Sequence, residues 1–170
     1  MAVVRTSKIT HKQLVERGGN WLTSSKSCIV TIMERQSGGL SGESPDVLGW
    51  DCNGHSYLIE CKVSLSDFYQ DKNKHFRDSA NGYNCGMGEL RYYLCPKGLI
   101  SPDQVPEKWG LLYATDYQIR TIKHPTPYNL SNDVQRYEIA MIARMMRDIR
   151  LGCIIVRPEQ LKEQDESRGN

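Results

Sequence analysis

The sequence predicts an α/β fold in which helices cover a central mixed sheet. Two observations lead to this prediction: helical and strand-like patterns are interspersed along the chain, and the clearest strand pair is apolar on both of its faces. A length of 170 residues suits one domain with an ordinary hydrophobic core. We therefore expect a single domain over residues 1–157 and a charged, flexible tail over residues 158–170.

Local patterns predict the elements of the first part of the chain. Apolar residues among polar positions predict a helix over residues 8–22, loosened at Gly18-Gly19. A short β-branched run over residues 28–33 predicts a strand. The glycine- and serine-rich stretch over residues 37–44 predicts a loop that leads to the next strand.

A hairpin and a capped helix follow. Two apolar strands over residues 46–50 and 56–63 are joined through Asn53-Gly54, a strong signal for a tight turn. Ser64, with Asp67 three residues later, resembles a capping box and predicts a helix that continues to about residue 75.

The second half of the chain contains further strands and one long helix. A glycine-rich stretch over residues 78–89 predicts a loop. Strands are expected over residues 90–95, 110–114 and 117–122. Apolar residues that recur at intervals of three or four predict a helix over residues 132–151.

The length of the hairpin turn decides which residues of its two strands face each other. A two-residue turn would place Asp46 opposite Cys61. A three-residue turn that begins at Cys52, with Gly54 in the left-handed conformation, places Asp46 opposite Glu60 instead. We predict the three-residue turn, or another bulge that gives the same pairing.

Under that pairing, Asp46, Glu60 and Lys62 share one face of the sheet. Glu60 and Lys62 are two residues apart on a strand, so their side chains point the same way while Cys61 points to the other face. Carboxylates that hold Mg²⁺ can supply the activated water and the charge neutralisation that phosphodiester cleavage requires. The alternative is a structural Glu60–Lys62 ion pair, with Asp46 capping a turn.

Pro45-Asp46, followed across a hairpin by Glu60-Cys61-Lys62, resembles the motif of the PD-(D/E)xK nuclease superfamily, and the resemblance covers roughly residues 12–77. It implies a restriction-endonuclease-like α/β/α sandwich with a central mixed sheet. It also implies a Mg²⁺-dependent endonuclease of DNA, of the small bacterial or phage-borne restriction or repair type, for which Mn²⁺ would substitute for Mg²⁺. Asp46, Glu60 and the backbone carbonyl of Cys61 would bind the metal, and Lys62 would orient the attacking water or steady the phosphate.

Members of this superfamily often take a further acid from the first helix. Glu16 is our candidate for that acid, ahead of Glu34 and Glu43. A polar residue on the helix after the lysine, together with nearby cations, is expected to contact phosphates. The residues predicted to bind nucleic acid in this way are Gln70, Lys72, Lys74 and Arg77.

Composition limits the other function classes. No apolar run is long enough to span a membrane and no secretory signal is recognised, so we expect a cytoplasmic protein that does not contact a membrane. The six cysteines contain no C-x-x-C pair, which favours reduced thiols, although Cys52 with His55 leaves zinc as an alternative. Neither a P-loop nor a G-x-S-x-G motif is present.

A net charge of +2 does not by itself identify an anionic partner. DNA is the expected partner, and RNA, a second copy of the chain and another protein are left open. The main alternative function is a catalytically inactive module of the nuclease fold that binds nucleic acid or a protein. A metal-stabilised interaction protein is a third candidate.

Overall fold

The structure is a computed structural model that describes residues 9–34, 43–72 and 86–149. The chain divides into two compact units, residues 1–135 and residues 136–170. The sheet and two of the helices belong to the first unit, whereas helix α3 (Asn132–Ile149) crosses the boundary. The tail predicted over residues 158–170 lies outside the described residues. No helix in the described part is long and apolar enough to cross a membrane.

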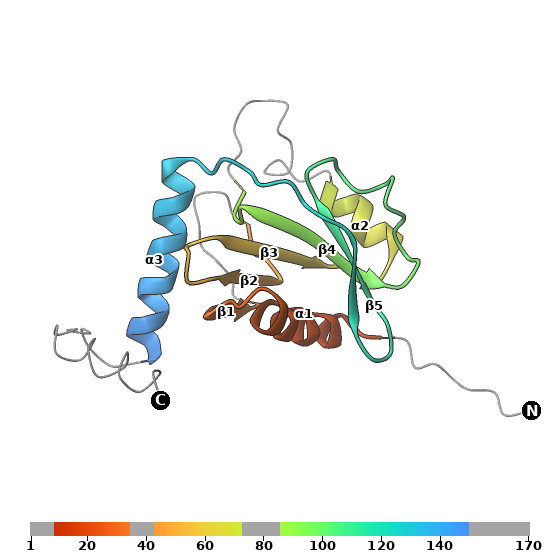
Figure 1. Cartoon of the computed structure of the whole chain (residues 1–170), viewed down its shortest axis with the longest axis horizontal. Coiled ribbons are helices and arrows are strands. Elements are labelled where there is room, and N and C mark those ends of the chain that lie inside the picture. Colours follow the sequence, from red (N-terminus) through yellow and green to blue (C-terminus); the bar gives the residue numbers. More distant parts are fainter. Residues whose placement is uncertain (1–8, 35–42, 73–85, 150–170) are drawn as a thin grey trace, which may run out of the picture. The chain divides into compact units, whose positions relative to one another are not determined.

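A six-stranded mixed sheet in the order β1-β2-β3-β4-β5-β6 forms the centre of the first unit (Figure 1). Neighbouring strands are antiparallel except for β3–β4 and β4–β5, which are parallel. The α/β fold with a mixed sheet is therefore confirmed, and each strand lies at its predicted segment within a few residues. The strands are β1 (Val30–Met33), β2 (Val47–Trp50), β3 (Ser56–Cys61), β4 (Leu90–Pro96), β5 (Gly110–Ala114) and β6 (Ile119–Lys123).

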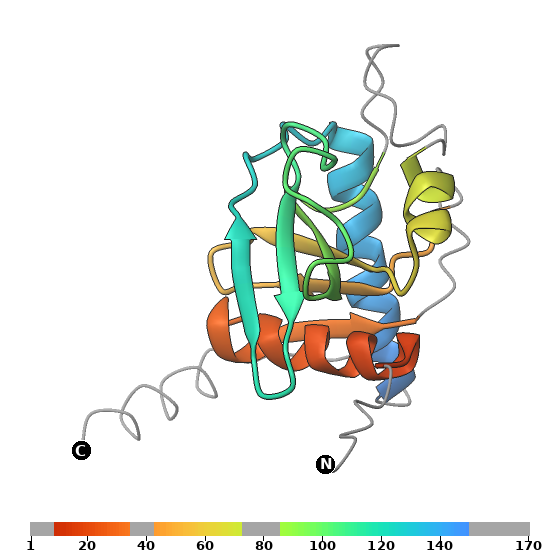
Figure 2. The same cartoon turned by 90° about the vertical axis from the view of Figure 1, so that its right-hand side faces the viewer.

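Helix α1 (His11–Ser25) packs on one face of this sheet (Figures 1 and 2). A capping box starts it: the Thr10 side chain accepts a hydrogen bond from the Gln13 backbone, and the Gln13 side chain accepts one from the Thr10 backbone. The predicted loosening at the glycines is wrong, because the helix runs through them without a break. Gly18 instead faces the sheet, where an added Cβ atom would lie 3.3 Å from the Leu94 side chain.

Helix α2 (Leu65–Lys72) packs on the opposite face. Ser64 caps it, as predicted, because its hydroxyl accepts a hydrogen bond from the backbone three residues later at 3.2 Å. Phe68 is fully buried, and its ring meets the edge of the Tyr93 ring at a centroid distance of 5.0 Å. Tyr93 in turn stacks on Trp109 at 4.4 Å. The contact between Phe68 and Tyr93 therefore holds α2 against β4.

The turn between β2 and β3 has the predicted three-residue form. The Gly54 N–H donates to the Asp51 carbonyl at 3.2 Å, and the Asp51 N–H donates to the His55 carbonyl at 3.1 Å. Gly54 has a φ of 84°, the left-handed conformation that this turn requires at its last residue. The expectation on which the pairing of Asp46 and Glu60 depended is thus confirmed.

His55 connects this turn to the segment before β4. Its Nδ1 atom lies 2.7 Å from Oε2 of Glu89. The hydrogen bond to Glu89, followed by the charge of that carboxylate, raises the pKa of His55 above its usual value of 6.5. A group with a raised folded-state pKa stabilises the fold fully below its unfolded-state pKa, and this contribution is lost as pH rises through the folded-state pKa.

We therefore expect His55→Gln to destabilise the protein more at about pH 5.5 than at about pH 8.5. Urea denaturation of both proteins at the two pH values measures the difference. Glu89→Gln is the control background. In that variant, adding His55→Gln should change the free energy of unfolding by nearly the same amount at both pH values. An equal loss of stability at both pH values would contradict the assigned ion pair.

Candidate functional site

The hairpin register brings Asp46 to the strand that carries Glu60 and Lys62. Val47 pairs with Ile59 in the β2–β3 ladder, and one further step in the same register places Asp46 opposite Glu60. Residues that face each other across antiparallel strands share a face of the sheet. The register that the three-residue turn predicts is therefore present, and it sets Asp46 opposite Glu60.

The Asp46 carboxylate lies at the backbone between Glu60 and Lys62. Its Oδ2 atom accepts a hydrogen bond from the Cys61 N–H at 2.7 Å, and 19% of its side chain is exposed. In the same register the residue opposite Cys61 is Pro45, which has no N–H to donate to the Cys61 carbonyl. The role of the Cys61 carbonyl as a metal ligand stays a prediction.

Glu60 and Lys62 form a buried ion pair that also includes an acid from α2. Nζ of Lys62 lies 3.1 Å from Oε2 of Glu60 and 3.5 Å from Oδ1 of Asp71. The exposed fractions of the three side chains are 3% for Glu60, 5% for Lys62 and 1% for Asp71. The Tyr93 hydroxyl donates to Oδ2 of Asp71 at 2.9 Å. Asp71 and Tyr93 are thus parts of the site that the sequence did not indicate.

The environment of Lys62 keeps its amine charged. Burial, the largest single influence, acts to lower the pKa of Lys62, but the carboxylates of Glu60, Asp71, Asp67 and Asp46 together outweigh it. The net result is a pKa above the usual 10.5. At neutral pH this environment favours Lys62 as a positive charge and a hydrogen-bond donor.

A histidine from the start of α1 lies on the other side of the Asp46 carboxylate. Nε2 of His11 is 3.4 Å from Oδ2 of Asp46, and Nδ1 is 3.6 Å from Oε1 of Glu34. The Glu34 N–H also donates to the Asp46 carbonyl at 2.9 Å. Sequence spacing gave no signal for His11, because this contact depends on how α1 packs against the end of the sheet.

The three candidates for the additional acid lie in different places. Glu34 is joined to Asp46 through His11, as described above. Glu16 is exposed on α1, and no hydrogen bond or ion pair within the described residues connects it to Asp46, so its role stays a prediction. Glu43 is fully buried and accepts a hydrogen bond from the Met87 N–H at 2.6 Å, so it anchors the segment before β4.

The residues predicted to contact nucleic acid are only partly described. Gln70 is exposed on α2. Lys72 belongs to the same helix, but its side chain is not among those described, and Lys74 and Arg77 lie outside the described residues. Their predicted contacts with phosphates therefore stay predictions.

Within residues 9–34, 43–72 and 86–149, no three His, Cys, Asp or Glu residues lie close enough to hold a metal by themselves. Mg²⁺ in proteins often keeps several waters and binds only one or two carboxylates together with substrate phosphates. Binding of Mg²⁺ by Asp46, Glu60 and the Cys61 carbonyl therefore stays a prediction.

Comparisons with known proteins show the fold and no activity. No family model matches the sequence, and no curated protein matches it. A solved structure described as the SPO1766 protein of unknown function from Silicibacter pomeroyi is similar to this chain, with a TM-score of 0.57 and 22% sequence identity. The match covers 88% of this chain and 99% of that one.

Proposed function

We propose that this protein is a Mg²⁺-dependent endonuclease that hydrolyses DNA phosphodiester bonds, with its reaction centre at Asp46, Glu60 and Lys62. The hairpin register is the observation that supports this most strongly, because it places the carboxylate of the Pro45-Asp46 pair against the Glu60-Cys61-Lys62 segment. Around these residues, a helix and a strand come before the hairpin and a capped helix follows it. A restriction-endonuclease-like sandwich is therefore part of the proposal.

Each residue has a role that its surroundings favour. Asp46, Glu60 and the Cys61 carbonyl would hold Mg²⁺, which when bound supplies an activated water and neutralises charge on the phosphate. Lys62, which stays protonated, steadies the phosphate or orients the water. His11 lies 3.4 Å from the same Asp46 oxygen that accepts the Cys61 N–H, and it would restrain the orientation of that carboxylate.

One observation favours a second candidate function. The side chains of Glu60 and Lys62 are only 3% and 5% exposed, and both take part in an ion-pair network that includes Asp71. Buried networks of this kind also serve purely structural roles. A module that binds nucleic acid without cutting it would be consistent with this burial, and the cleavage assay below separates the two functions.

The decisive variant is Asp46→Asn, which retains the shape of the side chain and an oxygen that can accept the Cys61 N–H. The full chain is incubated with supercoiled, linear, branched and single-stranded DNA and with RNA, in Mg²⁺, Mn²⁺ or EDTA. We expect cleavage by the wild type in either metal, none in EDTA, and a loss of about a hundredfold or more in the variant.

Glu107→Gln is the matched control, because it neutralises an exposed carboxylate on the loop between β4 and β5. It should cut at the wild-type rate, and thermal melting should show that both variants are folded. Equal cleavage by Asp46→Asn and the wild type would refute the proposed centre. Binding by a wild type that never cuts would support the second candidate function.

A further inference from the structure

An open groove of about 1000 Å³ lies where strands β3, β4 and β5 end. Val63 on its wall directly follows Lys62, but it packs against the core cluster under α1, whereas Lys62 points to the α2 side of the sheet. None of the described residues that line the groove belongs to the proposed reaction centre. The remaining walls come from α1, from the segment after β4 and from the β5–β6 hairpin.

A second hollow of about 410 Å³ extends the first along α1. The two share Arg17, Tyr117 and Gln118, so we treat them together as the α1 groove. Its helical wall runs from Arg17 to Ser25, a path of about 12 Å at the rise of an α-helix, and Ile9 adds to the lining just before the helix begins. A groove elongated along a helix suits a linear ligand better than a compact one.

The charge of the α1 groove is positive. Arg17, Lys97 and Arg120 line it, and Asp116 is the one acidic residue among the lining residues. None of the three cations forms an ion pair with a carboxylate of a described residue. These charges are therefore available to an anionic ligand.

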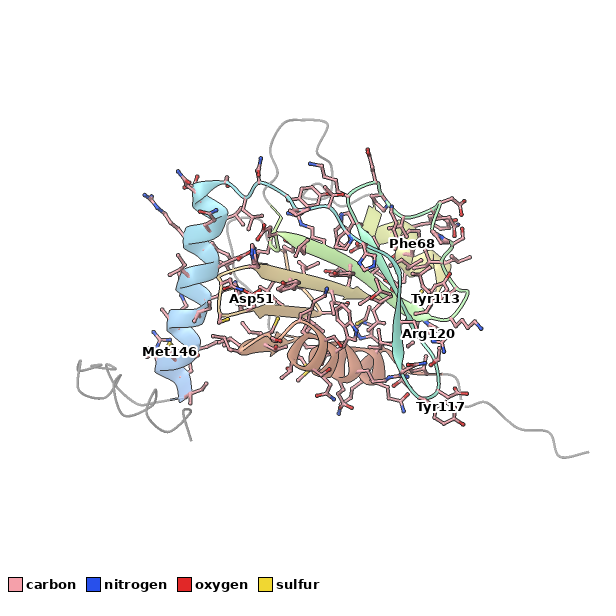
Figure 3. All side chains as sticks on the ribbon, viewed as in Figure 1. Asp51, Phe68, Tyr113, Tyr117, Arg120 and Met146 are labelled. Carbon is pink, nitrogen blue, oxygen red and sulfur yellow. The ribbon has the colours of Figure 1, made fainter. Side chains whose placement is uncertain are left out.

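The β5–β6 hairpin adds aromatic rings to the cations (Figure 3). Tyr117 at its turn is 95% exposed, so its ring is open to a ligand. Tyr113 lies directly opposite Arg120 in the β5–β6 ladder. The side-chain oxygen of Gln118, once its amide is oriented toward Arg120, accepts two hydrogen bonds from that guanidinium, each at 2.9 Å. Gln118 therefore fixes where the charge of Arg120 lies.

We propose that the α1 groove binds single-stranded nucleic acid. Arg17, Lys97 and Arg120 would contact successive phosphates, and an unpaired base would stack on Tyr117. The carboxylates of an acidic protein segment could bind the same cations, but they provide no ring that stacks on Tyr117. The bases of a duplex are already stacked on one another. This inference rests on the proposed function in taking the bound strand as the substrate of the nuclease, and it names the class of that substrate.

The test measures binding in EDTA, so that it does not depend on cleavage. Fluorescence anisotropy of a labelled oligothymidine of about 20 nucleotides gives the dissociation constant and its salt dependence. We expect Tyr117→Ser to weaken binding about tenfold. The association constant falls as salt rises, and Arg120→Gln should make the slope of its logarithm against the logarithm of the salt concentration shallower by about 0.7. Lys12→Gln, which removes an exposed cation of α1 outside the groove, is the control and should bind as the wild type does.

Three results would overturn the proposal: wild-type binding by Tyr117→Ser and Arg120→Gln, tighter binding of a duplex of equal length, or equally tight binding of polyglutamate. The Asp46→Asn protein separates this proposal from the proposed function, since it should bind oligothymidine normally in EDTA. If Asp46→Asn and Lys12→Gln bind oligothymidine normally but the wild type cuts no substrate, the proposed nuclease activity is refuted and the proposed binding by the α1 groove is not. If the wild type cuts in a metal-dependent way but Tyr117→Ser and Arg120→Gln bind normally, the proposed binding by the α1 groove is refuted and the proposed nuclease activity is not.

Discussion

Lys62→Met is expected to lower the free energy of unfolding by about 3–5 kcal/mol. The substitution removes the ammonium that lies 3.1 Å from Glu60 and 3.5 Å from Asp71, while both carboxylates remain buried. Two desolvated negative charges would then face each other across the former position of Lys62. Leaving buried carboxylates without a partner lowers the free energy of unfolding far more than losing a surface ion pair, which is worth at most about 1 kcal/mol. Urea denaturation with linear extrapolation measures the loss.

Two companion variants separate the charge effect from a packing effect. Glu60→Gln leaves the pair of Lys62 and Asp71 intact, so it should cost only about 1–3 kcal/mol. The triple variant Lys62→Met, Glu60→Gln, Asp71→Asn has no buried charge at these positions and should recover most of the stability that Lys62→Met loses. If Lys62→Met is as stable as the wild type, or the triple variant recovers nothing, the network does not hold the fold in the way described.

These variants also bear on function. Glu60→Gln should remain folded, so its effect on cleavage can be compared directly with that of Asp46→Asn. A folded Glu60→Gln protein that no longer cuts would assign the carboxylate to the chemistry. A folded variant that cuts at the wild-type rate would leave the ion pair with a structural role alone. The partly exposed Asp46 is the safer probe of activity, and the buried pair is the better probe of stability.

The parts of the fold and of the site that the sequence predicts depend on short-range chemistry. Asn53-Gly54 specifies a tight turn, and the length of that turn fixes the pairing of Asp46 with Glu60. The cap at Ser64 likewise needs only the residues that follow it. Each strand is recognised from its own run of apolar residues. Close neighbours in the chain therefore account for most of the elements and for the three central residues.

The missed parts of the site depend on contacts between distant segments. Glu60 and Tyr93 are partners in the parallel β3–β4 ladder, and nothing local sets that register. Asp71 reaches Lys62 only because α2 packs over the sheet, and His11 reaches Asp46 only because α1 begins beside the start of β2. A sequence pattern within one segment cannot indicate such contacts between distant segments.

The glycines show the same limit at the level of single backbone positions. The pair at 18 and 19 was interpreted as a weak point of a helix, a correct statement of propensity. In the structure the same pair lets α1 lie close to the sheet, and a Cβ atom on Gly19 would come within 2.7 Å of the Met33 sulfur. The function of a glycine is therefore decided by what it touches, and that is a tertiary property.

Gly88→Ala is the second substitution with a large expected effect, a loss of about 2–5 kcal/mol in the free energy of unfolding. Gly88 has a φ of 79°, which costs an alanine about 1–2 kcal/mol. An added Cβ atom would also lie 2.5 Å from the Leu58 Cβ atom and 3.1 Å from the Leu58 nitrogen, an overlap that adds about 1–3 kcal/mol. Backbone atoms make up part of this contact, so a change of rotamer cannot relieve it.

Gly54→Ala provides the matched control, because Gly54 has nearly the same φ, 84°, but nothing within 4 Å of the added Cβ atom. It should cost only the conformational part, about 1–2 kcal/mol. The difference between the two alanine variants therefore measures how closely the segment before β4 lies on β3. Equal losses would contradict that close approach. Because Leu58 and Glu60 lie on the same face of β3, a displaced Leu58 should also disturb Glu60, so Gly88→Ala should lower cleavage while Gly54→Ala preserves it.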